Sequence, residues 1–202
     1  ILLMDIAEKV TGRKFSDLVN NWIFKPINMP NSYFNPPENL FDVIPPTEID
    51  NKYRNSIVKG VVHDENAFLM NGVSGHAGVF SNTHDIANYA QTMLNFGIYN
   101  GSRIFSHRSI KKFIKKQNIP YGSDYALGWD TPSNRGNSSA GDFFSDGSYG
   151  HLGFTGTSLW IDPNKEIIII LLTNRTYPSR EKEGMYQLRR KFHNEVMKSI
   201  AT

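Results

Sequence analysis

The stretch YGHLGFTGTSLWIDP, residues 149–163, combines one histidine, three glycines and two threonines with apolar residues, and it precedes the apolar run EIIIILL, residues 166–172. Between the two segments, residues 162–165 (DPNK) carry a proline early in a polar turn. This pattern predicts a hairpin of buried strands. Glycine within a strand indicates close approach of another backbone or of a ligand. We therefore expect the strand from residue 149 to line a site and its apolar neighbour to lie in the core.

The tripeptide at residues 151–153, His-Leu-Gly, resembles the third motif of the serine β-lactamase and penicillin-binding-protein superfamily. In that family Lys or His, a variable residue and Gly lie on the strand beside the active site. Residues 62–67, 75–81, 85–87 and 172–175 resemble family segments in the same order. The closest form is the class C-like one. The resemblance implies an α+β fold of the β-lactamase/DD-peptidase type, with an antiparallel sheet flanked by helices and a helical lobe beside it.

The family's nucleophile is the serine of a Ser-x-x-Lys motif at the start of a helix, and a Tyr-x-Asn motif follows it. The resemblance places both motifs before the region that this chain covers. We therefore expect residues 1–202 to form a single partial domain whose N-terminal part, nucleophile included, is missing. Residues 1–120 would be mostly helical lobe and cleft wall, and residues 121–202 would be antiparallel strands plus a C-terminal helix.

Short matches to these motifs also occur within the chain. Ser-x-x-Lys fits Ser56, Ser109 and Ser179, and Tyr-x-Asn fits Tyr33 and Tyr53. Ser109 is expected to open a lysine-rich surface helix and Ser179 to cap the last helix, which are ordinary roles. Ser56 follows the Tyr-x-Asn matches instead of preceding them. None of the three is expected to be a nucleophile, so the chain alone should form no adduct with a fluorescent penicillin or a fluorophosphonate.

His151 is the main candidate catalytic residue. By resemblance its imidazole faces the cleft, where it donates to a substrate carboxylate or carbonyl or relays a proton. The alternative is a histidine whose hydrogen bonds are satisfied at the entrance of a strand. Gly153 would let the substrate backbone lie beside the strand. The backbone N–H of Phe154 would be one half of the oxyanion hole, and the serine's own N–H the other.

Three further residues are candidates for substrate binding. Thr155 offers a polar contact, as Thr157 and Ser158 also would. Hydroxyl and β-branched residues are normal in strands as well, and a structural role is favoured for these three. Asn174 and Arg175 end the neighbouring strand. Arg175 would either bind a substrate carboxylate bidentately or pair with an acidic side chain of the last helix.

The histidines and acids at residues 63–65 (HDE) and at His76 are of metal-ligand type. Their spacing does not match His-Glu-x-x-His or a related signature, so loop anchoring is the expected role. The glycine-rich residues 72–78 lack the Lys-Ser/Thr ending of a phosphate loop. We expect no metal and no cofactor.

Composition excludes or disfavours several classes of protein. The chain has a formal net charge of +3 and no cysteine, which excludes disulfides and thiol chemistry. Its lysine cluster at residues 111–116 fits a solvated helix face better than a nucleic-acid contact. No apolar run approaches the ~20 residues of a membrane span.

Periodicity predicts five helices. They are residues 1–10, buried on most sides and followed by Gly12 as the stop signal; 16–24, with Leu18, Val19, Trp22 and Ile23 inward; 81–96, capped by Ser81; 106–117; and 180–200, with Met185, Leu188, Phe192 and Val196 on the sheet. Residues 28–59 are expected to be irregular, residues 125–129 to form a strand, and residues 131–148 to form a polar loop.

The resemblance implies a serine hydrolase that acts through an acyl-enzyme on esters, D-amino-acid peptides or β-lactams. A small molecule or a peptidoglycan-derived compound would be the substrate, and an extracytoplasmic location is typical. Fusion to an upstream glycoside hydrolase domain would fit cell-wall recycling. The alternative is a non-catalytic module of the same fold that binds peptidoglycan fragments or serves as a scaffold.

Overall fold

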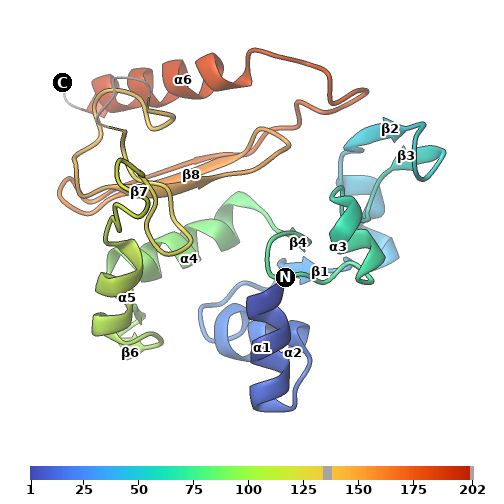
Figure 1. The fold of residues 1–202 in the computed structure, drawn as a ribbon, viewed down its shortest axis with the longest axis horizontal. Helices are drawn as coiled ribbons and strands as arrows, with labels where there is room; N and C mark the ends of the chain where they lie inside the picture. Colours follow the sequence, from blue (N-terminus) through green and yellow to red (C-terminus); the bar gives the residue numbers. More distant parts are fainter. Residues whose placement is uncertain (134–137, 201–202) are drawn as a thin grey trace. The chain divides into compact units, whose positions relative to one another are not determined.

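The computed structural model describes residues 1–133 and 138–200 (Figure 1). The chain divides into two compact units. The first unit comprises Ile1–Asn88 and Asn174–Glu181, and the second comprises Tyr89–Thr173 and Lys182–Thr202. Each unit has its own helices and strands, and each unit contains some of the candidate site residues.

The first unit begins with α1 (Leu2–Thr11) and α2 (Phe15–Val19), and α2 continues into a π-helical segment, η1 (Asn20–Phe24). The N–H of Phe15 donates to the Glu8 side chain at 2.7 Å, which ties α2 to α1. Strands β1 (Tyr33–Phe34) and β4 (Val79–Phe80) form one antiparallel pair, and β2 (Glu48–Asp50) and β3 (Ser56–Val58) form another. The 3-10 helix η2 (Glu38–Val43) and helix α3 (Glu65–Leu69) complete the unit, together with the first half of α4 (Thr83–Leu94).

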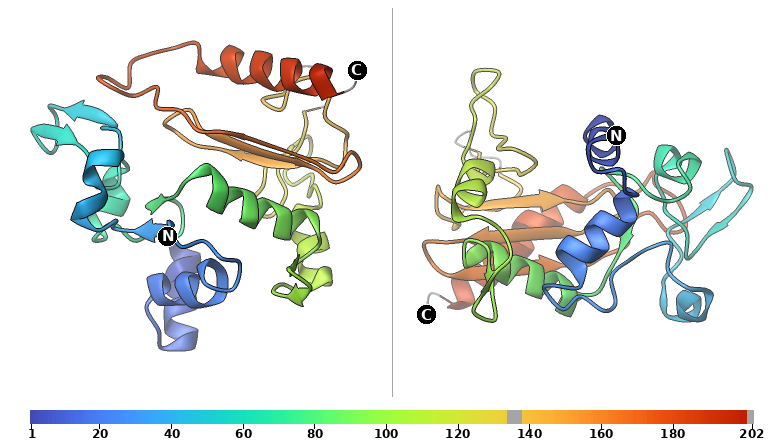
Figure 2. Two further views of the ribbon diagram at one scale, coloured as in Figure 1. Left: turned by 180° about the vertical axis from the view of Figure 1, so that it is seen from behind. Right: turned by 90° about the horizontal axis from the view of Figure 1, so that it is seen from below.

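The second unit contains the main sheet. Its strands β7 (Tyr149–Leu152), β8 (Ser158–Asp162) and β9 (Ile167–Leu171) are antiparallel in the order β7-β8-β9. The unit also contains the small hairpin of β5 (Ile98–Tyr99) and β6 (Ser102–Arg103), helix α5 (His107–Ile114) and helix α6 (Met185–Ile200). Figure 2 shows α6 running along one face of this sheet.

Alternation along β8 separates two cores. Trp160 and Ile161 are both fully buried and, because neighbouring strand residues point to opposite faces, each belongs to a different cluster. Ile161 packs with Met93, Trp129 and Tyr149. Trp160 packs with Phe144, Ile169 and, from α6, Met197. The sheet therefore has a core on each side, and α6 covers the Trp160 side.

The expectation of one long strand from residue 149 is wrong, because the glycine-rich part of the stretch is a turn. The N–H of Gly153 donates to the Thr157 carbonyl at 2.8 Å, and the N–H of Gly156 donates to the Gly153 carbonyl at 3.0 Å. Gly156 has a φ of +106°, which favours glycine. The second turn, at residues 162–165, is confirmed: the Asp162 side chain accepts from the N–H of Asn164 at 3.0 Å.

The strand predicted at residues 125–129 is also wrong. Tyr125 and Asp130 form only isolated bridges, and the N–H of Ala126 donates to the Trp129 carbonyl at 2.8 Å, which closes a tight turn. Gly128, with a φ of +81°, provides the backbone conformation that this turn needs. The apolar residues of the segment reach the core from a turn and not from a strand.

The first two helices are less buried than predicted. In α1 only Met4 is buried among the described residues, whereas Leu3 and Val10 are 81% and 80% exposed. Trp22, expected to point inward, is 55% exposed. An apolar side chain on a short helix is buried only where a neighbour covers it, and the described residues cover one stripe of each helix. The predicted stop at Gly12 is confirmed: its φ is +66° and its N–H donates to the Glu8 carbonyl.

The caps of two later helices differ from the predicted ones. The Asn82 side chain, and not Ser81, accepts the N–H of Asp85 at the start of α4. The last helix begins at Met185, and Ser179 accepts the N–H of Glu181 in the turn before it. Residues 28–59, expected to be irregular, contain the short elements β1, η2, β2 and β3.

The buried stripe of α6 lies one residue further along the chain than predicted. Arg189, His193 and Met197 are buried, whereas Leu188 is 53% exposed. Phe192 and Val196 are partly buried against the Trp160 cluster, as expected of them. The face of α6 that is buried is therefore the one on which Arg189 and His193 find hydrogen-bond partners.

Candidate functional site

Four of the candidate residues lie together at the end of β7, in the second unit. His151 is exposed and pairs in register with Leu159 of β8. Gly153, Phe154 and Thr155 form the turn that follows, and the Phe154 side chain is 57% exposed. The turn therefore presents its backbone and the His151 imidazole at one end of the sheet.

Gly153 has a close neighbour within its own hairpin. A Cβ at this position would lie 2.1 Å from Oγ1 of Thr157. Gly150, in the same strand, faces the Trp160 ring, 2.4 Å from where a Cβ would be. The glycines that the sequence offered as signs of a nearby ligand thus also have close neighbours within the hairpin.

Arg189 of α6 donates hydrogen bonds to the backbone of the turn. This side chain belongs to a residue only 8% exposed. Its Nε donates to the Gly156 carbonyl at 2.8 Å and its Nη2 donates to the Gly153 carbonyl at 2.6 Å. Both bonds are charge-assisted, and the planar guanidinium fixes two points of one turn at once.

His193, one turn further along α6, is fully buried beneath β8. Its Nδ1 lies 2.9 Å from the Ser139 carbonyl, and its Nε2 lies 3.1 Å from the Ser158 hydroxyl. Because a carbonyl only accepts, Nδ1 carries the proton and Nε2 of the neutral ring accepts from Ser158. Burial lowers the pKa of His193, which favours this neutral form. Ser158 therefore has a structural role.

Thr155 is also bonded within its unit, because its carbonyl accepts from the Thr173 hydroxyl at 3.3 Å. This bond uses the backbone of Thr155 and leaves the role of its side chain as a prediction.

A cavity of about 330 Å³ lies beside Leu152, the neighbour of His151. Asp124, Asp130 and Tyr186 contribute to its wall. Burial raises the pKa of Asp130, and Ser139 donates to its carboxylate at 3.3 Å. Asp130 is near enough to His151 for their charges to interact. No sequence motif marked Asp130; its backbone pairing with Gly150 is what brings it to β7.

Asn174 and Arg175 belong to the first unit, where both have partners in the chain. The Asn174 amide donates to the Pro46 carbonyl at 2.5 Å and its oxygen accepts from the Thr176 hydroxyl at 2.9 Å. Arg175 Nη1 donates to the Arg180 carbonyl at 2.9 Å. These contacts fasten the segment after β9 to the loop before β2. A substrate-binding role for either residue remains a prediction.

An ionic cluster around the buried Glu48 fixes the same segment. Glu48 of β2 is 6% exposed and accepts from Nε of Arg180 at 2.8 and 2.9 Å with its two oxygens. His63 Nε2 lies 2.9 Å from Glu48, and Arg180 also reaches Glu65 at 2.7 Å. The Arg180 guanidinium lowers the pKa of Glu48 to about 2.

The histidines considered as metal ligands make hydrogen bonds with side chains of their own unit. Asp64 caps α3 by accepting the N–H of Ala67 at 2.8 Å. It also lies 3.0 Å from Nε2 of His76, whose Nδ1 is 2.8 Å from the Ser74 hydroxyl. Among residues 1–133 and 138–200, no group of three or more side chains could hold a metal ion.

The three serines that match Ser-x-x-Lys lie in different settings. Ser56 is in strand β3, and Ser109 is inside α5, where its N–H donates to the capping Ser106. Ser179 lies in the turn before α6. Ser109 thus lies in the first turn of its surface helix, as expected, whereas Ser56 and Ser179 lie outside the helices.

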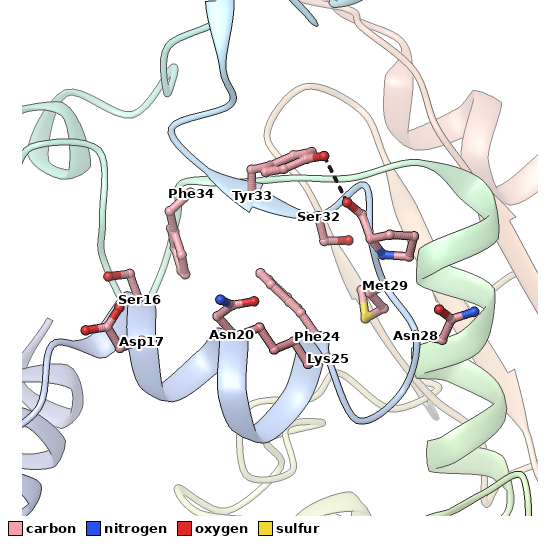
Figure 3. A pocket seen from close by; sticks show the side chains of 11 residues that line it. Ser16, Asp17, Asn20, Phe24, Lys25, Asn28, Met29, Ser32, Tyr33 and Phe34 are labelled. Atoms are coloured by element: carbon pink, nitrogen blue, oxygen red, sulfur yellow. Dashed lines mark hydrogen bonds between the residues drawn. The ribbon is translucent and has the colours of Figure 1, made fainter.

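The first unit has a pocket of its own, of about 530 Å³. Figure 3 shows Phe24 and Phe34 at its wall and the Tyr33 hydroxyl bonded to the Pro30 carbonyl, at 2.9 Å. None of the candidate catalytic or binding residues lines this pocket. In the part of the chain that the structure describes, no helix is long and apolar enough to cross a membrane.

Comparison with known proteins agrees with this architecture. The family model named Beta-lactamase matches residues 1–193. A protein of Escherichia coli O157:H7 called "Putative D-alanyl-D-alanine carboxypeptidase" is 37% identical over 193 residues, which are 88% of this chain and 44% of that protein. The chain thus spans less than half the length of this curated relative.

Two solved structures show the same fold at low identity. A β-lactamase from Mycobacterium bovis is 16% identical with a TM-score of 0.65, covering 98% of this chain and 60% of the other. An octameric penicillin-binding protein homologue from Pyrococcus abyssi is 21% identical with a TM-score of 0.58, covering 93% and 40%. The predicted α+β fold of the β-lactamase/DD-peptidase type is confirmed, and the chain belongs to the β-lactamase family, of whose matched members it covers a part.

Proposed function

We propose that this chain contributes one wall of the active site of a serine hydrolase that works through an acyl-enzyme. The observation that carries the proposal is the exposed His151 at the end of β7, directly before the turn of Gly153 and Phe154, in a chain matched by the family model over residues 1–193. The class C-like form of the third motif agrees with it.

D-Amino-acid peptides are the substrate class that we favour, ahead of esters and β-lactams. The relative's name, which mentions D-alanyl-D-alanine, supports this choice. Such a peptide ends in a carboxylate, and an imidazole at His151 would donate a hydrogen bond to it or to the scissile carbonyl. A peptidoglycan fragment outside the cytoplasm would be the source of such a peptide.

In the proposed reaction, the nucleophile is a serine of a Ser-x-x-Lys motif outside these 202 residues. Its hydroxyl oxygen attacks the peptide carbonyl carbon and its proton passes to the adjacent base. The oxyanion that forms accepts hydrogen bonds from the N–H of Phe154 and from the serine's own N–H. The C–N bond then breaks, the leaving amine takes a proton, and water hydrolyses the acyl-serine ester. His151 would assist the proton transfers or hold the substrate.

Turnover by the whole protein tests this proposal. The protein encoded by the complete reading frame that contains these residues should release D-alanine from a peptide ending in D-alanyl-D-alanine. It should turn over a nitrophenyl ester and a chromogenic cephalosporin more slowly. Turnover of the ester alone would refute the substrate class. Absence of turnover on all three, with measurable binding of the peptide by calorimetry, would instead favour the binding module.

A further inference from the structure

We propose that Arg189 is a positioning residue that orients the N–H of Phe154 for the oxyanion. This inference rests on the proposed function, because it gives the Phe154 N–H its task. It also stands on contacts within one unit: Arg189, Gly153, Phe154 and Gly156 all belong to the second.

The orientation follows from the planarity of one peptide group. The carbonyl of Gly153 and the N–H of Phe154 belong to the same peptide, which is trans, so they point in opposite directions. Arg189 Nη2 holds that carbonyl at 2.6 Å, on the side of α6. The N–H of Phe154 is therefore directed away from Arg189.

Two further bonds keep the peptide from rotating. The Gly153 carbonyl also accepts from the N–H of Gly156 at 3.0 Å. Arg189 Nε holds the Gly156 carbonyl at 2.8 Å, so one guanidinium fixes both ends of the turn. A turn that contains two glycines would otherwise have many backbone conformations open to it. Preorganised donors stabilise a developing charge because they need no reorientation during the reaction.

The positive charge has a second effect. A carbonyl that accepts a charge-assisted bond is polarised, and this polarisation strengthens the N–H of the same peptide as a donor. Arg189 is buried, so water screens its charge little. The sequence shows Arg189 only as a basic residue in a polar helix, but it lies four residues before His193 on the buried stripe.

The test compares Arg189→Met with Arg190→Met in the whole protein. Both changes remove a guanidinium from neighbouring positions of α6, but the Arg190 guanidinium pairs with Asp142, which lies outside the turn. Loss of a complete oxyanion donor lowers kcat about 10²- to 10³-fold. We expect Arg189→Met to lower kcat per titrated active site by about 10- to 100-fold with KM changed less than about 3-fold. Arg190→Met should stay within about 2-fold of the wild type.

Arg189→Lys keeps the charge and separates the two effects. A lysine ammonium lacks the fork that holds two carbonyls, so an intermediate loss of kcat is expected. Counting only titrated sites removes any loss that comes from unfolded protein. Equal kcat in Arg189→Met and Arg190→Met would overturn the positioning role while the proposed function stands.

Amide hydrogen exchange tests the turn independently of activity. In Arg189→Met, the N–H groups of Gly153 and Gly156 should exchange at least about 10-fold faster than in Arg190→Met, because the turn opens more often. Unchanged exchange would overturn the inference. A wild-type protein without acyl-transfer activity would overturn the proposed function and, with it, the catalytic task given to Arg189.

Discussion

Replacement of His151 by alanine is expected to lower kcat/KM of the whole protein by about 10²- to 10⁴-fold, the usual contribution of a positioned proton-transfer group. The residue is exposed at the end of β7 and its neighbours in the ladder are held by backbone bonds. Its side chain therefore contributes little to the core, and the melting temperature should change by less than about 2 °C. Steady-state kinetics and thermal unfolding of the purified variant measure the two effects.

His84→Ala is the matched control, because His84 is an exposed histidine, with a side chain 77% exposed, and none of our proposals gives it a task. It should retain wild-type kcat/KM within about 2-fold. Separate measurement of kcat and KM then assigns the role of His151. A higher KM with unchanged kcat indicates substrate binding, and a lower kcat indicates proton transfer. Wild-type kinetics in His151→Ala would remove this residue from the proposed site.

Replacement of Glu48 by glutamine is expected to destabilise the fold by about 1 to 3 kcal/mol, because the Arg180 guanidinium loses the buried Glu48 carboxylate as a partner and keeps that of Glu65. Glu48 accepts from Arg180 with both oxygens and from His63. Urea unfolding of Glu48→Gln, Arg180→Met and the double variant measures the coupling between the two charges. Glu195→Gln, at an exposed pair with Lys198, is the control and should cost less than about 1 kcal/mol.

The pH dependence of the same pair has a definite sign. Arg180 lowers the pKa of Glu48 to about 2 from its ordinary 4.5. The folded protein therefore binds this proton more weakly than the unfolded chain does, and stability falls as the pH drops from about 4.5 toward 2. This fall should be smaller in Glu48→Gln than in the wild type. Equal acid sensitivity of the two proteins would contradict the assignment of the pKa shift to Glu48.

Periodicity and turn chemistry predicted the parts of the fold that depend on local sequence. The turn at residues 162–165, the stop at Gly12 and the run at residues 167–171 were readable, because proline, glycine and β-branched residues restrict the backbone directly. The break after Leu152 was not, since a glycine-rich segment is compatible with a strand or with a turn until its hydrogen-bond partners are known. Burial of α1 was over-predicted because apolar composition does not say which neighbour covers a helix.

The candidate site likewise contains residues that the sequence predicted and residues that it did not. His151 and Phe154 could be selected because a motif marks them, although their roles come from the resemblance. Arg189 and His193 could not, because polar residues in a helix ordinarily face water and periodicity counted only apolar positions. A search for any residues at four-residue spacing before Met197 would have placed both on one stripe. Asp130 reaches β7 through a backbone bridge, for which sequence patterns give no sign.

Trapping of the acyl-enzyme tests the central claim most directly. The whole protein is incubated with a fluorescent penicillin and with a fluorophosphonate, and the modified peptide is identified by mass spectrometry. Our account predicts one adduct per protein, on a serine of a Ser-x-x-Lys motif outside residues 1–202, and slower formation of the penicilloyl adduct in His151→Ala. Absence of any adduct, or stoichiometric labelling of Ser56, Ser109 or Ser179, would contradict it.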